Sequence, residues 1–313
     1  MSYPIATVDL EQINRNILSC RRPVILMVKA DAYGLGVEKV VGATPKALGY
    51  GVATMDEGIK LRRSTDKPIL VTTPPFGEAC LEYALTPMVG DEACAKALPK
   101  GCKVHIKVNT GMNRFGVTPK FAVSLARYCL DRGLVVTGIA THYASADKAV
   151  EQNMSFRQAV ADVERVTGRL LRHAEASSTC KFEWFDVVRM GLNAYQNAVT
   201  VRSTILVVRR VKAGDRVGYD GVYSMPQDGL IAVVAGGYAD GFAKGLRGGL
   251  LRCRGRLHKI VAVCMDVILV HLACACEVGD EVILTYLPPI LSPYELLTGL
   301  KGRTSFEYQC QDT

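Results

Sequence analysis

The sequence predicts an α/β fold followed by β structure, namely an N-terminal (β/α)8 TIM barrel and a C-terminal, predominantly β domain. From residue 23 to about residue 191, eight short apolar runs alternate with charged, helix-compatible segments. That alternation is typical of parallel strands joined by helical crossovers. After about residue 200 the runs become rich in Val and Ile and are bounded by Gly, Asp or Pro, which indicates strands joined by turns.

Each expected barrel strand is a short apolar run between turn signals, as is typical of strands buried on both faces. The eight runs cover residues 23–28, 48–54, 69–73, 84–89, 103–108, 135–141, 170–174 and 185–188. The helical pattern lies between them, at residues 56–64, 91–98, 118–132 and 148–168. In the second part, strands are expected within residues 203–211, 230–238, 259–272 and 281–287, with turns at 213–215, 248–249 and 279–280.

Composition excludes several classes of protein. The net charge is +8, but no run of Lys and Arg exceeds two residues, so a nucleic-acid interface is not expected. The most apolar stretch, residues 260–276, contains Asp266 and His271 and is too polar to span a membrane. The eleven cysteines include no Cys-x-x-Cys pair, so we expect no metal site and a reducing, cytoplasmic location.

Lys29 stands where the apolar run that begins at Pro23 stops. A lysine at the end of a buried strand is costly unless it is paired, deprotonated or covalently used. Lys29 is therefore a candidate Schiff-base lysine. Taken alone, the residue is better interpreted as a lysine that bends out of the strand end to solvent.

Further candidate side chains also stand at the ends of expected strands. In a (β/α)8 barrel the active site lies at the C-terminal ends of the strands. Lys107 ends the fifth expected strand, His142 ends the sixth and Arg189 ends the eighth, while Ser177 lies just beyond the seventh. This placement predicts that these side chains share one site.

The sequence resembles the alanine racemase family through seven motifs in the family's order. They are VKADAYGLG (28–36), KVNTGMNRFGV (107–117), THYASAD (141–147), FDVVRMGLNAY (185–195), VGYDG (217–221), GGYADG (236–241) and VCMD (263–266). The resemblance implies a pyridoxal 5'-phosphate enzyme that interconverts L- and D-alanine, supplies D-alanine for peptidoglycan, and works as a homodimer with shared active sites. It also implies that the strand at residues 1–8 joins the C-terminal domain, which gives a barrel at 9–200 and a β domain at 201–313.

By this resemblance, Lys29 binds the cofactor aldehyde as an aldimine and then acts as one of two bases at the substrate Cα. Tyr238 matches the second base, which comes from the partner subunit in the family. Arg189 matches the arginine that hydrogen-bonds the pyridine nitrogen, and His142 supports it. Since a guanidinium does not give up its proton, the nitrogen stays unprotonated, which limits side reactions.

The remaining candidate residues bind the two anionic groups. By resemblance, the cofactor phosphate is bound by Tyr33, Ser177 and the amides of Gly191 and Leu192. Arg114 binds the substrate carboxylate, and Lys107 matches a lysine, often carbamylated, that orients that arginine. Met265 and Asp266 match a segment that closes the entry from the partner subunit.

Three positions depart from the family pattern: Gly302 replaces a phosphate-contacting tyrosine, Asn109 replaces an aspartate, and Val267 replaces a glutamine. These changes would weaken cofactor retention and leave both bases in place. The alternatives are a racemase of other or broader amino-acid range, a barrel-type amino-acid decarboxylase, or a non-catalytic pyridoxal-phosphate-binding protein. Arg189 and the GGYADG motif argue against the decarboxylase, and the second domain with Tyr238 and Asp266 argues against the non-catalytic protein.

Overall fold

The computed structural model describes residues 3–175, 185–284 and 293–310. The chain divides into two compact units. The barrel unit comprises Ile13–Ala32 and Gly36–Gln196, and the β unit comprises Met1–Gln12, Tyr33–Leu35 and Asn197–Thr313. Within the described ranges, no helix is both long and apolar enough to cross a membrane.

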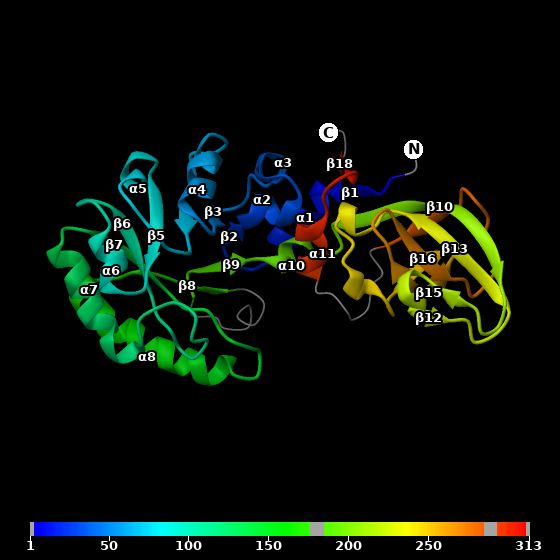
Figure 1. Ribbon diagram of the computed structural model, residues 1–313. Helices are drawn as coiled ribbons and strands as arrows, with labels where there is room; N and C mark the ends of the chain where they lie inside the picture. The colour runs from blue at the N-terminus through cyan, green and yellow to red at the C-terminus, as the bar shows by residue number, and fades with distance from the viewer. Residues whose placement is uncertain (1–2, 176–184, 285–292, 311–313) are drawn as a thin grey trace. The chain divides into compact units, whose positions relative to one another are not determined.

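The barrel unit contains a closed ring of eight parallel strands, β2 to β9, in chain order (Figure 1). This confirms the predicted TIM barrel, and each of the eight expected runs overlaps one strand. The strands are β2 (Val24–Met27), β3 (Gly49–Val52), β4 (Ile69–Val71), β5 (Leu85–Val89), β6 (Lys103–Lys107), β7 (Val135–Ala140), β8 (Leu171–Glu175) and β9 (Val187–Met190).

Helices connect these strands. They are α1 (Leu10–Leu18), α3 (Val37–Ala43), α4 (Met55–Arg62), α5 (Ala79–Glu82), α6 (Glu92–Lys96), α7 (Ala122–Asp131), α8 (Ala149–Thr167) and α10 (Leu192–Tyr195), with a 3-10 turn at Pro119–Phe121. The longest, α8, buries Phe156, Val160 and Val163, a spacing that puts all three on one helix face. At the start of α4, Thr54 and Glu57 form a reciprocal capping box.

The segment directly after β2 has an unusual backbone. In α2 (Lys29–Gly34), residues Ala30, Asp31, Ala32 and Tyr33 have φ angles of 50°, 55°, 53° and 59°. They form a left-handed turn, which costs roughly 1–2 kcal/mol for each residue that has a Cβ. The surrounding structure must therefore stabilise it.

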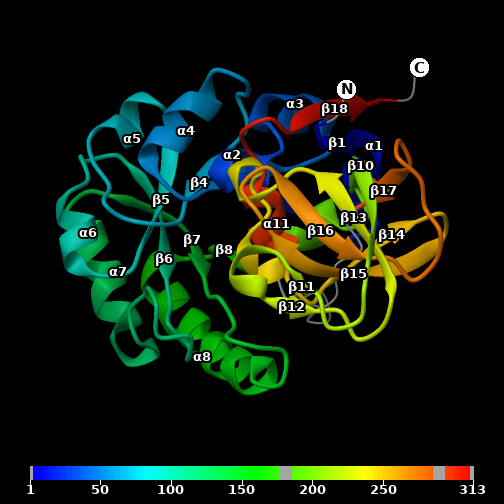
Figure 2. The same ribbon diagram turned by 45° about the vertical axis from the view of Figure 1, so that its right-hand side comes forward.

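The β unit is built on an eight-stranded sheet with the order β13-β16-β15-β14-β17-β10-β1-β18 (Figure 2). An additional pairing of β10 with β13 joins six of these strands into a ring. The strands are β1 (Ile5–Asp9), β10 (Val199–Val211), β13 (Gly229–Ala235), β14 (Leu250–Cys253), β15 (Arg256–Val263), β16 (Val267–His271), β17 (Glu281–Ile283) and β18 (Ser305–Gln309). A small hairpin of β11 (Arg216–Val217) and β12 (Tyr223–Ser224), three 3-10 turns (Tyr219–Gly221, Tyr238–Asp240, Lys244–Leu246) and helix α11 (Pro293–Gly299) complete the unit.

The predominantly β character of this unit agrees with the prediction, although the strand count was too low. The expected run at 259–272 is divided into β15 and β16, which pair antiparallel around residues 264–266. Strands β11, β12, β14 and β18 were not predicted. Edge strand β18 carries alternating exposed and half-buried side chains, so it lacks the continuous apolar run by which buried strands are recognised.

Candidate active site

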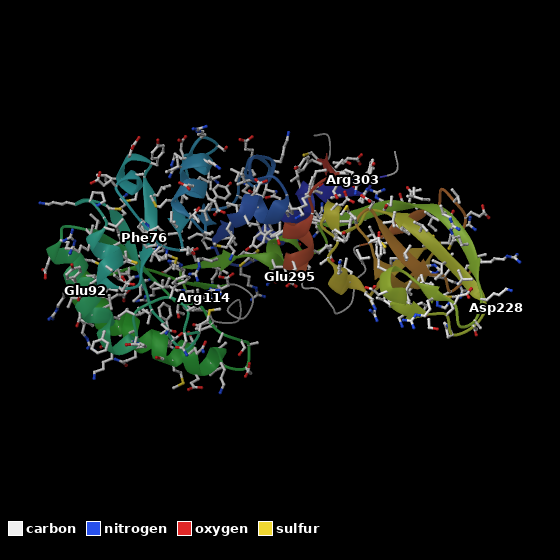
Figure 3. The ribbon with its side chains drawn as sticks, viewed as in Figure 1. Phe76, Glu92, Arg114, Asp228, Glu295 and Arg303 are labelled. Atoms are coloured by element: carbon white, nitrogen blue, oxygen red, sulfur yellow. The ribbon has the colours of Figure 1, made fainter. Side chains whose placement is uncertain are left out.

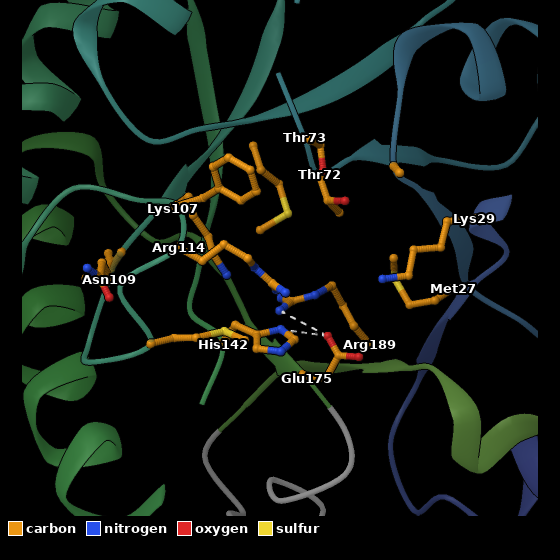
Figure 4. Close-up of a pocket in the computed structure, with 15 residues that line it drawn as sticks. Met27, Lys29, Thr72, Thr73, Lys107, Asn109, Arg114, His142, Glu175 and Arg189 are labelled. Carbon is orange, nitrogen blue, oxygen red and sulfur yellow. Dashed lines mark ion pairs between the residues drawn. The ribbon is translucent and has the colours of Figure 1, made fainter. Parts of the chain in front are cut away.

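The candidate site is a pocket at the C-terminal ends of the barrel strands (Figure 4). Five of the predicted site residues line it: Lys29, Lys107, Arg114, His142 and Arg189. Lys29 and Arg114 extend toward the centre from opposite sides, with Arg189 between them. The strand-end rule predicted that Lys29, Lys107, His142 and Arg189 share one site, and all four line this pocket.

Lys29 is positioned by the left-handed turn that follows it. The Ala30 amide donates a 2.8 Å hydrogen bond to Oε1 of Glu57. The other oxygen of Glu57 accepts from the amides of Ala53, at 2.7 Å, and Thr54, at 3.3 Å. One carboxylate at the start of α4 therefore ties the lysine segment to the end of the neighbouring strand β3.

Arg189 is 2% exposed and fixed by two hydrogen bonds. Its Nη2 donates to the carbonyl oxygen of Thr141 and its Nη1 to Nδ1 of His173, both at 2.6 Å. Nε2 of His173 lies 2.7 Å from Nδ1 of His105. Because a guanidinium can only donate, His173 must carry its proton on Nε2 and donate to His105. Both imidazoles are thus fixed as neutral tautomers.

The surroundings keep these imidazoles uncharged. Burial, and secondly the charge of Arg189, lower the pKa of His105 to about 3. The same causes hold the pKa of His173 well below its ordinary value. Gly138 gives His105 its space, since a Cβ on this glycine would lie 2.6 Å from the imidazole ring.

Glu175, at the end of β8, supplies a carboxylate to the pocket. Nδ1 of His142 donates to its Oε2 at 2.9 Å, and Nη2 of Arg189 lies 4.0 Å from the same oxygen. Burial opposes ionisation, but the hydrogen bond from His142 and the charge of Arg189 lower the pKa of Glu175 to about 2. Burial also lowers the pKa of His142 despite Glu175. A neutral imidazole therefore donates to a carboxylate, and His142 is linked to Arg189 through Glu175.

Lys107 and Arg114 contribute further nitrogen groups from β6 and the loop after it. Burial lowers the pKa of Lys107 well below its ordinary value, and the charge of Arg189 adds to this effect. A lysine in this setting has a larger fraction of uncharged amine at neutral pH. Asn109 stabilises the loop that carries Arg114: its Oδ1 accepts from the amides of Gly111, at 3.1 Å, and Asn113, at 3.0 Å.

The predicted phosphate-binding residues are placed less completely. Tyr33 is buried in the left-handed turn and falls in the β unit. Gly191 and Leu192 follow β9 directly, at the junction with α10. Ser177 lies outside the described residues. Their contact with a phosphate stays a prediction.

Tyr238, Met265 and Asp266 belong to the β unit, and their roles stay predictions. The Tyr238 amide donates to the Cys264 carbonyl at 3.0 Å, and the ammonium of Lys244 lies 5.1 Å from the centre of the Tyr238 ring. Asp266 pairs at 2.9 Å with Nη2 of Arg303, which is labelled in Figure 3.

Arg303 also binds the buried Asp240 through two bonds of 2.8 Å. This ion pair connects the GGYADG and VCMD motifs to the chain just before β18. Gly302, next to Arg303, has a φ of 66°, and a Cβ there would lie 2.3 Å from the Ala239 carbonyl oxygen. The position therefore excludes the tyrosine expected from the family pattern.

Three residues of this network were missed by the sequence analysis: His105, His173 and Glu175. Glu175 ends a predicted strand, so the strand-end rule could have identified it. His105 and His173 lie within strands and point into the barrel, where an isolated histidine gives no signal of its own.

The family model of the alanine racemase N-terminal domain matches residues 8–198, and that of the alanine racemase C-terminal domain matches residues 198–308. The chain belongs to the alanine racemase family. An alanine racemase of Streptococcus pyogenes serotype M28 is 32% identical over 322 aligned positions, which cover 90% of this chain and 87% of that protein.

Solved structures of the family share the fold. Alanine racemase from Acinetobacter baumannii matches with a TM-score of 0.85 at 23% identity, covering 99% of this chain and 100% of that one. A structure from Bartonella henselae with covalently bound pyridoxal phosphate matches with a TM-score of 0.83 at 23% identity and the same coverage.

Proposed function

We propose that this protein is an alanine racemase that uses pyridoxal phosphate and two bases to interconvert L- and D-alanine. The observation that carries the proposal is the composition of the barrel pocket. The pocket holds the amine of Lys29 at one side and Arg114 at the other, and the buried, hydrogen-bonded Arg189 lies between them. Membership of the alanine racemase family over both domains supports it.

The side chains in the pocket fit the cofactor. Lys29 offers the amine that would hold its aldehyde carbon. Arg189 donates one hydrogen of Nη1 to His173 and one of Nη2 to Thr141, and among the described residues its Nε–H has no partner, so this N–H is available to a ring nitrogen. The guanidinium groups of Arg114 and Arg189 also suit an anionic cofactor and a carboxylate substrate.

When bound, pyridoxal phosphate withdraws electrons from the substrate Cα and makes its proton acidic. Lys29 would remove or return that proton on one face, and Tyr238 of a partner subunit on the other. Arg189 would hold the ring nitrogen as an acceptor without transferring a proton to it. Glu175 opposes the effect of burial on Arg189 and so helps this guanidinium to stay charged.

Arg114 would bind the substrate carboxylate, with Lys107 positioning it. An uncharged amine is the form that reacts with carbon dioxide, so the lowered pKa of Lys107 supports its carbamylation. Met265 and Asp266 would close the entry, while Tyr33, Ser177, Gly191 and Leu192 would bind the phosphate.

The protein would act as a cytoplasmic homodimer with a barrel at residues 9–200 and a β domain at 201–313 with strand 1–8. The division into a barrel unit and a β unit supports these boundaries. The described cysteines are all thiols, which supports the location. The product D-alanine would serve peptidoglycan synthesis.

The test is to incubate the purified protein with pyridoxal phosphate and L-alanine in heavy water, and to follow deuterium at Cα together with product chirality. We expect deuterated D-alanine. Deuterated L-alanine alone would show that one base works and would contradict the role of Tyr238. Exchange with another amino acid but not with alanine would show that the other amino acid is the substrate.

A further inference from the structure

Two buried thiols touch at the end of the barrel opposite the candidate active site. Cys80 lies on α5 and Cys102 directly precedes β6. Their Sγ atoms are 2.7 Å apart and each residue is 1% exposed. Because a disulfide bond is about 2.05 Å long, only a small side-chain movement separates the two thiols from bonding distance.

A cavity of about 520 Å³ gives access to this pair, here called the barrel dithiol. Its walls come from the N-terminal ends of the strands, whereas the active-site pocket is formed at their C-terminal ends. Leu48 and Leu81 at its rim are 43% and 52% exposed. Both thiols line this cavity, so a small neutral oxidant that enters it can reach their sulfur atoms.

The two thiols differ in chemical character. The hydrogen bond between the two thiols lowers the pKa of Cys80, and burial only partly opposes this effect. The same hydrogen bond, with burial adding to it, raises the pKa of Cys102. The Cys102 thiol also donates to the carbonyl oxygen of Lys103 at 3.6 Å, which favours its protonated form, so Cys80 is the better nucleophile and Cys102 the resolving thiol.

A second group of thiols provides an internal comparison. Cys253, Cys276 and His258 place their sulfur and nitrogen atoms within 4.8 Å of one another in the β unit. Burial and the neighbouring thiol raise the pKa of Cys276 to about 12, and burial also raises that of Cys253. Neither member of this pair has a lowered pKa, so we expect it to react more slowly.

We propose that the barrel dithiol is a site of reversible oxidation by hydroperoxides. The Cys80 thiolate attacks one peroxide oxygen; the O–O bond breaks, a sulfenic acid forms on Cys80, and the leaving hydroxide takes a proton to become water. The Cys102 sulfur then attacks the Cys80 sulfur; the S–O bond breaks, the disulfide forms, and a second water leaves. Two thiols lose two electrons and two protons, and one hydrogen peroxide is reduced to two waters.

We expect the disulfide bond to raise the stability of the protein and to leave its racemase activity nearly unchanged. The bond would connect α5 to the start of β6 and close the chain between residues 80 and 102, which contains β5. A cross-link over a segment of this length restricts the unfolded chain and should raise the thermal midpoint by several degrees. Racemase activity should change little, because the site lies away from the pocket that contains Lys29.

The test treats the reduced, cofactor-loaded protein with one equivalent of hydrogen peroxide, then blocks free thiols in denaturant and maps peptides by mass spectrometry. We expect a peptide pair joined through Cys80 and Cys102, two hydrogens lighter than the sum, that disappears with dithiothreitol. Recovery of Cys80 and Cys102 as blocked thiols, or joined to other cysteines, would overturn the proposal.

Variants separate the two roles. Cys102→Ser should leave a sulfenic acid on Cys80 that is trapped by dimedone, whereas Cys80→Ser should give no dimedone adduct on Cys102. Cys253→Ser is the matched control and should form the Cys80–Cys102 bond at the wild-type rate. Equal trapping at both positions would contradict the assignment of Cys80 as the nucleophile.

Discussion

Single residues at this site act through the direction of their hydrogen bonds. Arg189 can only donate, and this one property fixes the proton positions of His173 and His105 behind it. Glu175 acts in the opposite sense, as an acceptor for His142 and a counter-charge for Arg189. The arginine is therefore held between neutral acceptors and one carboxylate, an arrangement suited to a group that must stay protonated.

The role of Lys29 gives the first prediction. Lys29→Ala should remove the absorbance of covalently held cofactor and lower turnover by several orders of magnitude, because it deletes both the attachment point and one base. The exposed Lys60 on α4 offers a control, and Lys60→Ala should leave spectrum and turnover unchanged. An unaltered spectrum in Lys29→Ala would remove this residue from its proposed role.

The buried histidines predict a pH dependence of stability. With the pKa of His105 at about 3 in the folded state and about 6.5 in the unfolded chain, the unfolded chain binds more protons between these values. Stability is then fully present above pH 6.5 and declines toward pH 3, by up to about 1.4 kcal/mol per pH unit for each such histidine.

His105→Asn keeps an acceptor for His173 and removes one titrating group. Its free energy of unfolding, measured with urea and far-UV circular dichroism from pH 7 to pH 4.5, should fall less steeply than that of the wild type. The same slope in both proteins would show that His105 is not neutral in the folded state.

At the scale of elements, the left-handed turn α2 depends on a residue from a different element. Three backbone amides converge on Glu57, one of them from the turn itself. Glu57→Ala should lower the free energy of unfolding by about 1–3 kcal/mol and weaken cofactor binding, because the turn carries Lys29. Asp56→Ala, at the exposed neighbour, should change stability by less than about 0.5 kcal/mol. Denaturation midpoints and cofactor titrations check both, and equal effects in the two variants would show that the turn is stable without Glu57.

Sequence analysis succeeded where a structure is caused by neighbouring residues, and it failed where the cause lies in a distant part of the chain. The eight barrel strands were predictable because a strand buried on both faces is a continuous apolar run. The turn at Ala30–Tyr33 was not, since those residues have no local preference for positive φ and are held by Glu57. The division of residues 259–272 into a hairpin was missed for a similar reason: Cys264-Met265-Asp266 contains no Gly or Pro, and its backbone bonds to residues 236–239.

The candidate site likewise contains some residues that the sequence predicts and others that it does not. Lys29, Lys107 and Arg189 were found because they end strands or fall in motifs, and the structure places them around one pocket. His105 and His173 were not found, since β6 and β8 both pair with β7 and their rings meet only because the sheet curves around the barrel interior. The contact joins residues 68 positions apart, so no local pattern could reveal it.

At the scale of the whole molecule, the main question is whether two chains share each site. Lys29 lies in the barrel unit and Tyr238 in the β unit, and a racemase needs one base on each face of the substrate. If each site takes its lysine from one subunit and its tyrosine from the other, a mixed dimer has one intact site.

That arrangement can be tested by mixing Lys29→Ala with Tyr238→Phe, each expected to be inactive alone. In a mixed dimer the two changes fall together in one site and leave the other site unaltered. Random exchange at equal amounts makes half of the dimers mixed, so about a quarter of wild-type activity should return. Activity is followed as D-alanine formation, and subunit exchange is verified with two differently tagged chains. If exchange occurs and activity does not return, both bases of a site come from the same chain.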